Sequence, residues 1–281
     1  MLKINVSLLI IGNLGESGKI SLQSIIDLSP KRICYAADEA GESWTKTIID
    51  VHKSPNTKFC RHTIDNSTLD SLGIGQIESH RIFGTSDFIK ITPLKWLIIS
   101  QVIEKHKDID LVVFSDLDVI WFNFFTEYFQ AQEGVMAQND FRPITNEKYY
   151  CTGIMYWFPT TISKELCNKL FEFQINKILQ GDLIPDEPTF NQYLKKANLL
   201  YNVKPLPKDY FLIGHRAKSL LRSKNRVLRD ASAFHANYFV GDFQKKVVLN
   251  SIASNRRNGI FWRFGLALIF LFKVKDRLVR S

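Results

Sequence analysis

The sequence has few cysteines, and none of them form a common metal-binding or redox motif. The four cysteines, none of which belong to a C-x-x-C pair, are Cys34, Cys60, Cys151 and Cys167. This spacing argues against a zinc ribbon or a thioredoxin-type centre. Reduced thiols in a cytosolic protein are the simplest interpretation.

Long apolar runs and targeting signals are also lacking. The uncharged apolar run Phe264–Phe272 is far below the roughly 20 residues that span a bilayer. The N-terminus has no basic region followed by a long apolar stretch and a small-residue cleavage site, as a signal peptide would have. We therefore expect the catalytic part to be cytoplasmic.

The composition is that of a globular protein with an excess of positive charge. Of the 281 residues, 45% are hydrophobic and 23% are charged, so disorder is not expected. The net charge of +9 favours anionic partners, namely nucleic acid, acidic membrane surfaces or sugar nucleotides. Because no internal repeat or low-complexity linker interrupts the chain, we expect one catalytic domain over residues 1–250, followed by a basic tail over residues 251–281.

Strand and helix patterns alternate along the chain. Strands are expected at Ile4–Ile11, Arg32–Ala37, one short segment within 53–85, Leu111–Phe114, Gly134–Ala137, Gly153–Phe158 and 199–203. Helices are expected after a cap at Ser17, at Ser43–His52, from Pro93, near Phe124–Phe129, at Ile162–Leu179 and at Glu187–Lys196. This alternation predicts an α/β fold with a mixed, mostly parallel central sheet flanked by helices.

Two aspartates, Asp116 and Asp118, come just after the buried strand Leu111–Phe114. The carboxyl end of such a strand is where open α/β sheets bind ligands. Two carboxylates there can converge on Mg²⁺ or Mn²⁺, which prefers oxygen ligands and bridges diphosphate oxygens. Such an ion would neutralise charge on a departing nucleoside diphosphate. A capped turn with solvated aspartates is the alternative, although carboxylates between apolar runs are costly without charge compensation.

A D-x-D pair alone is weak evidence, since a chain of this length contains about one by chance. Asp108-Ile109-Asp110 is a second copy. It precedes the strand instead of following it, so we interpret it as a polar strand start.

The segment Phe114–Phe122 resembles the D-x-D segment of nucleotide-diphospho-sugar transferases with the GT-A fold. It is most similar to the group that contains plant cell-wall α-xylosyltransferases and their bacterial relatives. Three further stretches resemble later motifs of that group in the same order, Cys151–Pro159, Asp186–Asn191 and Phe234–Lys245. The resemblance covers roughly residues 86–246. It implies a GT-A-like fold and a glycosyltransferase that uses a nucleotide-diphosphate sugar, with a UDP-sugar favoured.

The resemblance also implies roles for individual residues. Asp116, Asp118 and His235 would hold Mn²⁺ or Mg²⁺, and Asp116 would also contact the ribose or the donor sugar. The other donor-binding residues that it implies are Lys95, Gly153, Asn191, Asn237, Gly241 and Lys245, with Lys246 as the alternative to Lys245. A neutral imidazole can ligate such an ion, and a glycine lets the backbone approach a phosphate. A structural histidine and solvated surface lysines are the alternatives.

Asp186 and Glu187 are candidates for the reaction centre, although the family commonly has glutamine where Glu187 stands. In a retaining transferase either carboxylate could act as the nucleophile or stabilise an oxocarbenium-like transition state. In an inverting enzyme one of them would be the base for the acceptor hydroxyl. The structural alternative makes Asp186 a helix N-cap before Pro188. The resemblance favours retention, and the residues alone leave the stereochemistry open.

The tail carries aromatic and aliphatic residues with basic flanks at Arg263 and Lys273. Such a composition suits an in-plane helix on an anionic membrane, and a terminal helix docked on the core is the alternative. We therefore expect a protein that is cytoplasmic or peripheral on the cytoplasmic face of a membrane. Its acceptor would be a glycan or a lipid-linked saccharide.

Two other functions compete with this one. A nucleotidyltransferase or another Mg²⁺-dependent phosphoryl-transfer enzyme also uses carboxylates, but the chain has no G-x-x-x-x-G-K-S/T loop. A basic nucleic-acid-binding protein is disfavoured, because the positive charge lies beside apolar residues in the tail and not along a readout helix. We expect no nucleic-acid partner.

Overall fold

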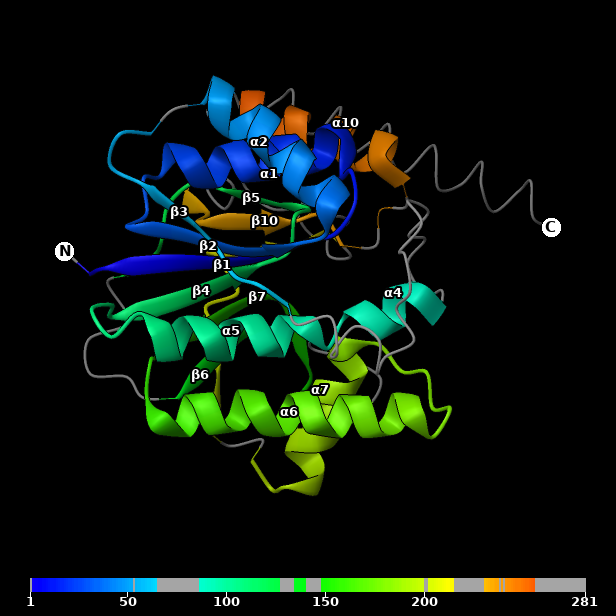
Figure 1. The fold of residues 1–281 in the computed structure, drawn as a ribbon. Helices are drawn as coiled ribbons and strands as arrows, with labels where there is room; N and C mark the ends of the chain where they lie inside the picture. Colours follow the sequence, from blue (N-terminus) through cyan, green and yellow to red (C-terminus); the bar gives the residue numbers. More distant parts are fainter. Residues whose placement is uncertain are drawn as a thin grey trace. The chain divides into compact units, whose positions relative to one another are not determined.

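The computed structural model describes residues 2–52, 54–64, 86–126, 134–139, 148–199, 202–214, 230–237, 239 and 241–255. The chain divides into two compact units. Unit 1 comprises Met1–Leu14, Ser29–Asp116 and Thr126–Leu206, and unit 2 comprises Gly15–Leu28, Leu117–Phe125 and Pro207–Ser281. Figure 1 labels the helices and strands of both.

Unit 1 is built on a mixed sheet whose order is β3-β2-β1-β4-β7-β6-β8 within the described residues. Its strands are β1 (Ile4–Ile10), β2 (Arg32–Ala37), β3 (Lys58–Arg61), β4 (Leu111–Ser115), β6 (Val135–Asn139), β7 (Tyr150–Trp157) and β8 (Val203–Leu206). Strand β7 is antiparallel to both of its neighbours, and the other neighbouring pairs are parallel. The predicted mixed, mostly parallel sheet is therefore confirmed.

Helices cover both faces of this sheet. They are α2 (Glu39–Val51), α4 (Ser86–Ile91), α5 (Leu94–Lys105), α6 (Thr161–Leu179) and α7 (Asp186–Lys196). Cys34 of β2 joins the apolar core together with Val102 of α5. The next residue, Tyr35, interacts with Glu42 of α2. Because neighbouring residues of a strand point to opposite faces, α5 and α2 pack on opposite faces of the sheet. Helix α6 lies alongside α5 (Figure 1).

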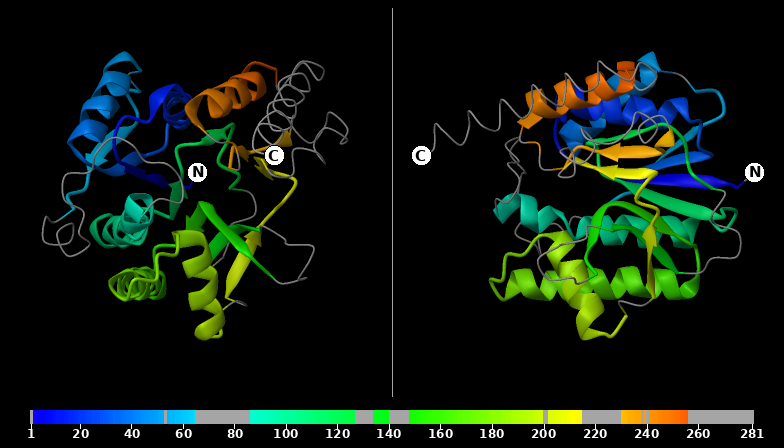
Figure 2. Two further views of the ribbon diagram at one scale, coloured as in Figure 1. Left: turned by 90° about the vertical axis from the view of Figure 1, so that its right-hand side faces the viewer. Right: turned by 180° about the vertical axis from the view of Figure 1, so that it is seen from behind.

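Unit 2 has a smaller sheet with the order β5-β10-β9 in the described part of the chain. Its elements are α1 (Gly15–Asp27), β5 (Val119–Trp121), β9 (Phe211–Ile213), β10 (Ala233–His235) and α10 (Gly241–Asn255). Helices α1 and α10 lie side by side, as Figures 1 and 2 show. Its apolar core includes Ile120, Phe234 and Leu249.

Several predicted boundaries are wrong. Helix α1 begins at Gly15, and the backbone N–H of Ser17 donates to the Asp242 carboxylate (2.8 Å), so Ser17 is not the cap. Helix α2 begins at Glu39 instead of Ser43, because Asp38 accepts a hydrogen bond from the Gly41 N–H and caps the helix. The strand expected at 199–203 is found at Val203–Leu206.

Other parts of the prediction are corrected or lie outside the described residues. Phe124 to Thr126 are not helical, and the rest of the expected helix near Phe124–Phe129 is not described. Strand β7 begins at Tyr150, before the expected Gly153. Elements α4, β5, β9, β10 and α10 were not predicted. The tail beyond residue 255 is not described, and the expected boundary at 251 falls inside α10. None of the described helices is long and apolar enough to span a bilayer.

Candidate active site

In unit 1 a buried lysine gathers two of the expected carboxylates. Lys95, on the first turn of α5, lies 3.5 Å from Asp116 Oδ1 and forms an ion pair with Asp186 Oδ2. It also donates to the carbonyl of Thr152 (3.2 Å), whose hydroxyl donates to Asp186 Oδ2 (2.5 Å). Lys95 is only 4% exposed, so its interpretation as a surface lysine is wrong.

The charges in this cluster support one another. Burial disfavours the charged ammonium, but the carboxylates of Asp116 and Asp186 outweigh it and raise the pKa of Lys95. Asp116 follows the last residue of β4, and its backbone N–H donates to the carbonyl of Gly153 on β7 (2.8 Å). The expected residues Lys95, Asp116, Gly153 and Asp186 are thus brought together in unit 1.

Helix α7 places Asp186 and Glu187 in its first turn, where carboxylates face the positive end of the helix dipole. Pro185 is the N-cap and Asp186 is already helical, so the N-cap interpretation of Asp186 is wrong. Glu187 is partly exposed and forms a side-chain hydrogen bond with Cys151. Burial first, and this carboxylate second, raise the pKa of the Cys151 thiol well above its ordinary value.

Asn191 binds to the backbone around it. Its Oδ1 accepts the N–H of Tyr150, and its Nδ2 donates to the carbonyls of Tyr150 and Glu187, all at 2.8 Å. Both amide N–H groups therefore have protein partners. The side chain fixes α7 to β7, and its role in donor binding stays a prediction.

In unit 2 the second aspartate of the D-x-D pair has two basic neighbours. His235 Nε2 lies 3.1 Å from Asp118 Oδ1, and Lys245 Nζ lies 2.7 Å from Asp118 Oδ2. The exposed fraction of the side chain is 15% for Asp118, 4% for His235 and 29% for Lys245. Strand pairing explains part of this arrangement, because His235 of β10 stands opposite Val119 of β5. Lys245 is paired with Asp118, so its interpretation as a solvated lysine is wrong.

The Asp118 carboxylate is strongly held as an anion. Burial opposes ionisation, but Lys245 and His235 outweigh it and lower the pKa of Asp118 far below its usual range. Its Oδ1 is nevertheless buried without an aligned hydrogen-bond donor among the described residues. A carboxylate oxygen and an imidazole nitrogen that face each other in this way are a fitting pair of ligands for a divalent cation.

Asn237 and Gly241 lie in the chain that follows β10. The Asn237 side chain accepts the backbone N–H of Gly214 (3.1 Å) and so joins this chain to the end of β9. Gly241 has φ +80°, a conformation that glycine adopts without strain, and it begins α10. Contacts of either residue with a donor remain predictions.

The second D-x-D copy has a structural role. Asp108 binds Lys31 and Arg32, and the Asp110 carboxylate accepts the backbone N–H of Lys3 (2.7 Å). These contacts tie the entry of β4 to the starts of β1 and β2, as expected for a polar strand start. Sequence reasoning missed Thr152 as the partner of Asp186. The only signal for it was its place beside Gly153 in a motif-bearing segment.

The comparisons with known proteins agree with the fold. The family model for nucleotide-diphospho-sugar transferases matches residues 55–249. The structure is similar to mouse xyloside xylosyltransferase 1 in its apo form (TM-score 0.55, 12% identity, covering 85% of this chain and 99% of that chain). It is also similar to the galactosyltransferase LgtC in complex with donor and acceptor sugar analogues (TM-score 0.56, 11% identity, 89% and 95%). No curated protein sequence gives a significant match. The fold is thus GT-A-like, as the sequence predicted.

Proposed function

The chain belongs to the nucleotide-diphospho-sugar transferase family and is a glycosyltransferase, and from this premise we propose that it is metal-dependent and uses a UDP-sugar. The acceptor is a hydroxyl of a glycan or of a lipid-linked saccharide. The observation that carries the proposal is the buried Asp118 carboxylate with His235 and Lys245 beside it. Family membership also sets the phosphoryl-transfer alternative aside.

Mn²⁺ or Mg²⁺ would be held by Asp118 and His235, whose facing atoms lie 3.1 Å apart. Asp116 is the third ligand in this proposal, since a single residue separates it from Asp118 in the chain. Carboxylate oxygens and an imidazole nitrogen suit these ions. Bound there, the ion supplies Lewis-acid stabilisation of the departing nucleoside diphosphate.

Lys245 provides a further positive charge for the donor. Its ammonium group rests on Asp118 Oδ2, and its side chain is about one-third exposed. A lysine on a flexible stem can move from a carboxylate to a phosphate oxygen. We assign Lys245 to the diphosphate, and Asn237 and Gly241 to the backbone that borders it.

The carboxylates of Asp186 and Glu187 differ in burial and in their contacts. The Asp186 carboxylate is buried and bound by Lys95 and Thr152, so it is a fixed negative charge. Such a charge stabilises an oxocarbenium-like transition state by electrostatic preorganisation. Glu187 is partly exposed, whereas Asp186 is buried. Glu187 is therefore the better placed of the two to act on the anomeric carbon, in a reaction that retains configuration.

The basic tail is assigned to an anionic membrane surface on the cytoplasmic side. This assignment rests on its sequence alone, with basic residues at both ends of the apolar run Phe264–Phe272. A lipid-linked acceptor would be presented at such a surface.

The proposal is tested by donor hydrolysis and transfer with a panel of sugar nucleotides, with and without Mn²⁺. Asp118→Asn should lower the rate by about 100-fold or more while preserving the circular dichroism spectrum, because a ligand is lost and the volume is kept. The matched control is Asp108→Asn, which changes the other D-x-D pair and should keep activity. Equal rates in the two variants, or full activity of the wild type in a chelator, would contradict the assignment.

A further inference from the structure

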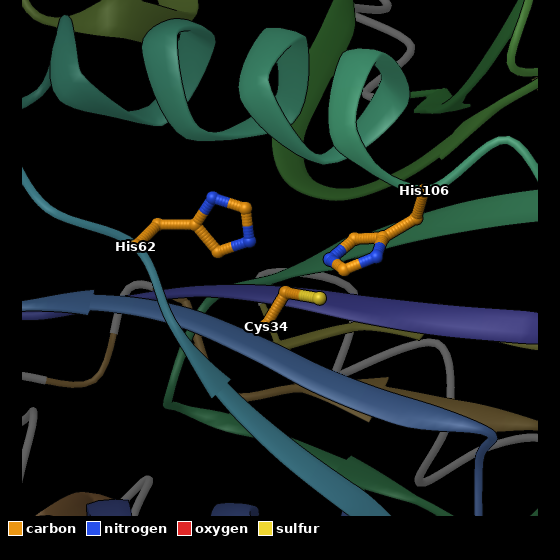
Figure 3. A group of neighbouring side chains, drawn as sticks. All are labelled: Cys34, His62 and His106. Atoms are coloured by element: carbon orange, nitrogen blue, oxygen red, sulfur yellow. The ribbon is translucent and has the colours of Figure 1, made fainter.

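A second group of potential metal ligands lies in unit 1, on the face of the sheet that α5 covers. Cys34 comes from β2, His62 follows the end of β3, and His106 is the C-cap residue of α5. Figure 3 shows the two imidazole rings pointing toward each other, with the Cys34 sulfur near the gap between them. The ring centroids are 5.7 Å apart.

The backbone explains why three distant residues meet. Cys34 stands opposite Cys60 in the β2–β3 register, so both side chains lie on one face of the sheet. His62, two residues further on, continues the ladder by donating its N–H to the carbonyl of Tyr35 (2.8 Å) and returns to the same face. Helix α5 packs on this face and ends at His106, whose N–H donates to the carbonyl of Val102 (3.1 Å).

One nitrogen of each imidazole in this group lacks a partner in the described part of the chain, whereas the Cys34 sulfur accepts a hydrogen bond from Asn5 Nδ2 (3.9 Å). The Nε2 atoms of His62 and His106 are both buried and have no hydrogen-bond partner among the described residues. His62 is 4% exposed and Cys34 is fully buried. A buried ring nitrogen without a partner costs roughly 1–3 kcal/mol. Two of them facing one thiol indicate that a ligand belongs between them.

The protonation states of the two histidines suit metal binding. Burial, and then Lys105 and His106, lower the pKa of His62 to about 4. Burial, and then Arg32, lower the pKa of His106. Both imidazoles are therefore neutral near pH 7, which is the form that binds metals. Burial raises the pKa of Cys34, so its thiol would lose its proton only when the sulfur coordinates a metal ion.

We propose that Cys34, His62 and His106 bind a zinc ion. One ligand atom from each residue lies within 4.8 Å of the others. In tetrahedral zinc sites, Zn–S bonds of about 2.3 Å and Zn–N bonds of about 2.0–2.1 Å place the ligand atoms about 3.3–3.6 Å apart. Small side-chain rotations therefore close the site. A thiolate with two imidazoles selects Zn²⁺ over Mg²⁺ or Mn²⁺.

The three side chains would leave the fourth zinc position to water, and the site is independent of the proposed sugar-transfer chemistry. His106 lies eleven residues beyond Lys95 along α5, a distance of about 16 Å at 1.5 Å per residue. The ion would join the end of α5 to β2 and to the chain after β3. It stabilises the fold because it binds the folded chain and not the unfolded one.

The experiment uses the reduced full-length chain, stripped of metal, in excess Mg²⁺ to saturate the carboxylate site. Co²⁺ is the probe, because a thiolate bound to four-coordinate cobalt gives a near-ultraviolet charge-transfer band and intense visible bands. Wild-type protein should show these bands, and Zn²⁺ should abolish them by displacement. Cys34→Ser should remove the charge-transfer band. His106→Gln, which changes a half-buried residue and preserves the fold, should weaken Co²⁺ binding by about 10–100-fold.

Two controls separate this site from its neighbours. Cys60→Ser, which changes the thiol beside Cys34, should retain the charge-transfer band. Asp118→Asn should also retain it, even though that variant tests the proposed function. Folded, reduced wild-type protein without the band would overturn the proposal, as would a Cys34→Ser variant that keeps it. Zn²⁺ should raise the Tm of the wild type by more than that of His106→Gln, and an equal rise in both would also overturn the proposal.

Discussion

Replacing Lys95 by methionine tests the charge cluster at the start of α5. Methionine keeps most of the apolar stem and removes only the ammonium group. The side chain of Lys95 is 5% exposed and that of Asp186 is 10% exposed, so the Asp186 carboxylate would remain buried without its cation. Breaking a buried ion pair from one side costs about 3–5 kcal/mol. We expect Lys95→Met to lower the free energy of unfolding by this amount.

The assay is urea unfolding followed by circular dichroism at neutral pH. The double variant Lys95→Met/Asp186→Asn should recover much of the loss, because the stranded charge is gone. Lys164→Met is the matched control, since Lys164 pairs with the largely exposed Glu104 and its loss should leave the midpoint nearly unchanged. If Lys95→Met unfolds at the same urea concentration as the control variant, the proposed cost of stranding the Asp186 carboxylate is wrong. A double variant no more stable than the single one would also contradict this cost.

The contribution of Lys95 to the free energy of unfolding should decrease at high pH. The pKa of Lys95 is raised above its ordinary value of 10.5. Its contribution to stability is therefore fully present below pH 10.5 and is lost as the pH rises through the folded-state value. The difference in unfolding free energy between wild type and Lys95→Met should persist at neutral pH and shrink in strong alkali.

Three further predictions concern the reaction, the donor and the tail. Glu187→Gln should lower turnover by orders of magnitude with little change in nucleotide affinity, whereas the exposed Glu165→Gln should keep wild-type kinetics; equal turnover would return Glu187 to a helix-start role. Lys245→Met should weaken UDP binding in calorimetry by about 10-fold while Mn²⁺ raises the Tm more than in the wild type, because a competitor for Asp118 is gone. Removing the residues after Arg257 should preserve donor hydrolysis and weaken binding to anionic vesicles, and an unfolded core would instead show that the tail packs on it.

The sequence predicts best the elements whose pattern depends on their own burial. Leu111 to Phe114 are all buried, as a continuous apolar run in a parallel sheet indicates. Helix α6 begins at Thr161 and ends at Leu179, within one residue of the prediction, because its N-cap Thr160 is local. Helix α1 was misplaced because its N-terminus is capped from 225 residues away by Asp242. No local pattern can reveal such a cap.

Some residues of the candidate site could be predicted from local sequence, and others are brought together only by the fold. The D-x-D pair was identified because the strand before it and the two carboxylates are contiguous. The pairing of Lys95 with Asp186, 91 residues apart, follows only once β4, β7 and the first turns of α5 and α7 are placed. The ligands Cys34, His62 and His106 come from three elements and share no motif spacing. The fold alone brings them together.

The lysines explain how the chain can keep two carboxylates in an apolar context before any ligand binds. Asp116 is balanced by Lys95, and Asp118 is balanced by Lys245, each within its own unit. Lys95 also pairs with Asp186, so these groups keep one net negative charge, which a divalent cation alone would overcompensate and a diphosphate alone would increase. Together the ion and the diphosphate would cancel most of each other's charge, and Lys245 would be free to pair with the phosphates. In the proposed mechanism the metal and the donor thus favour each other's binding, because each removes the electrostatic cost of the other.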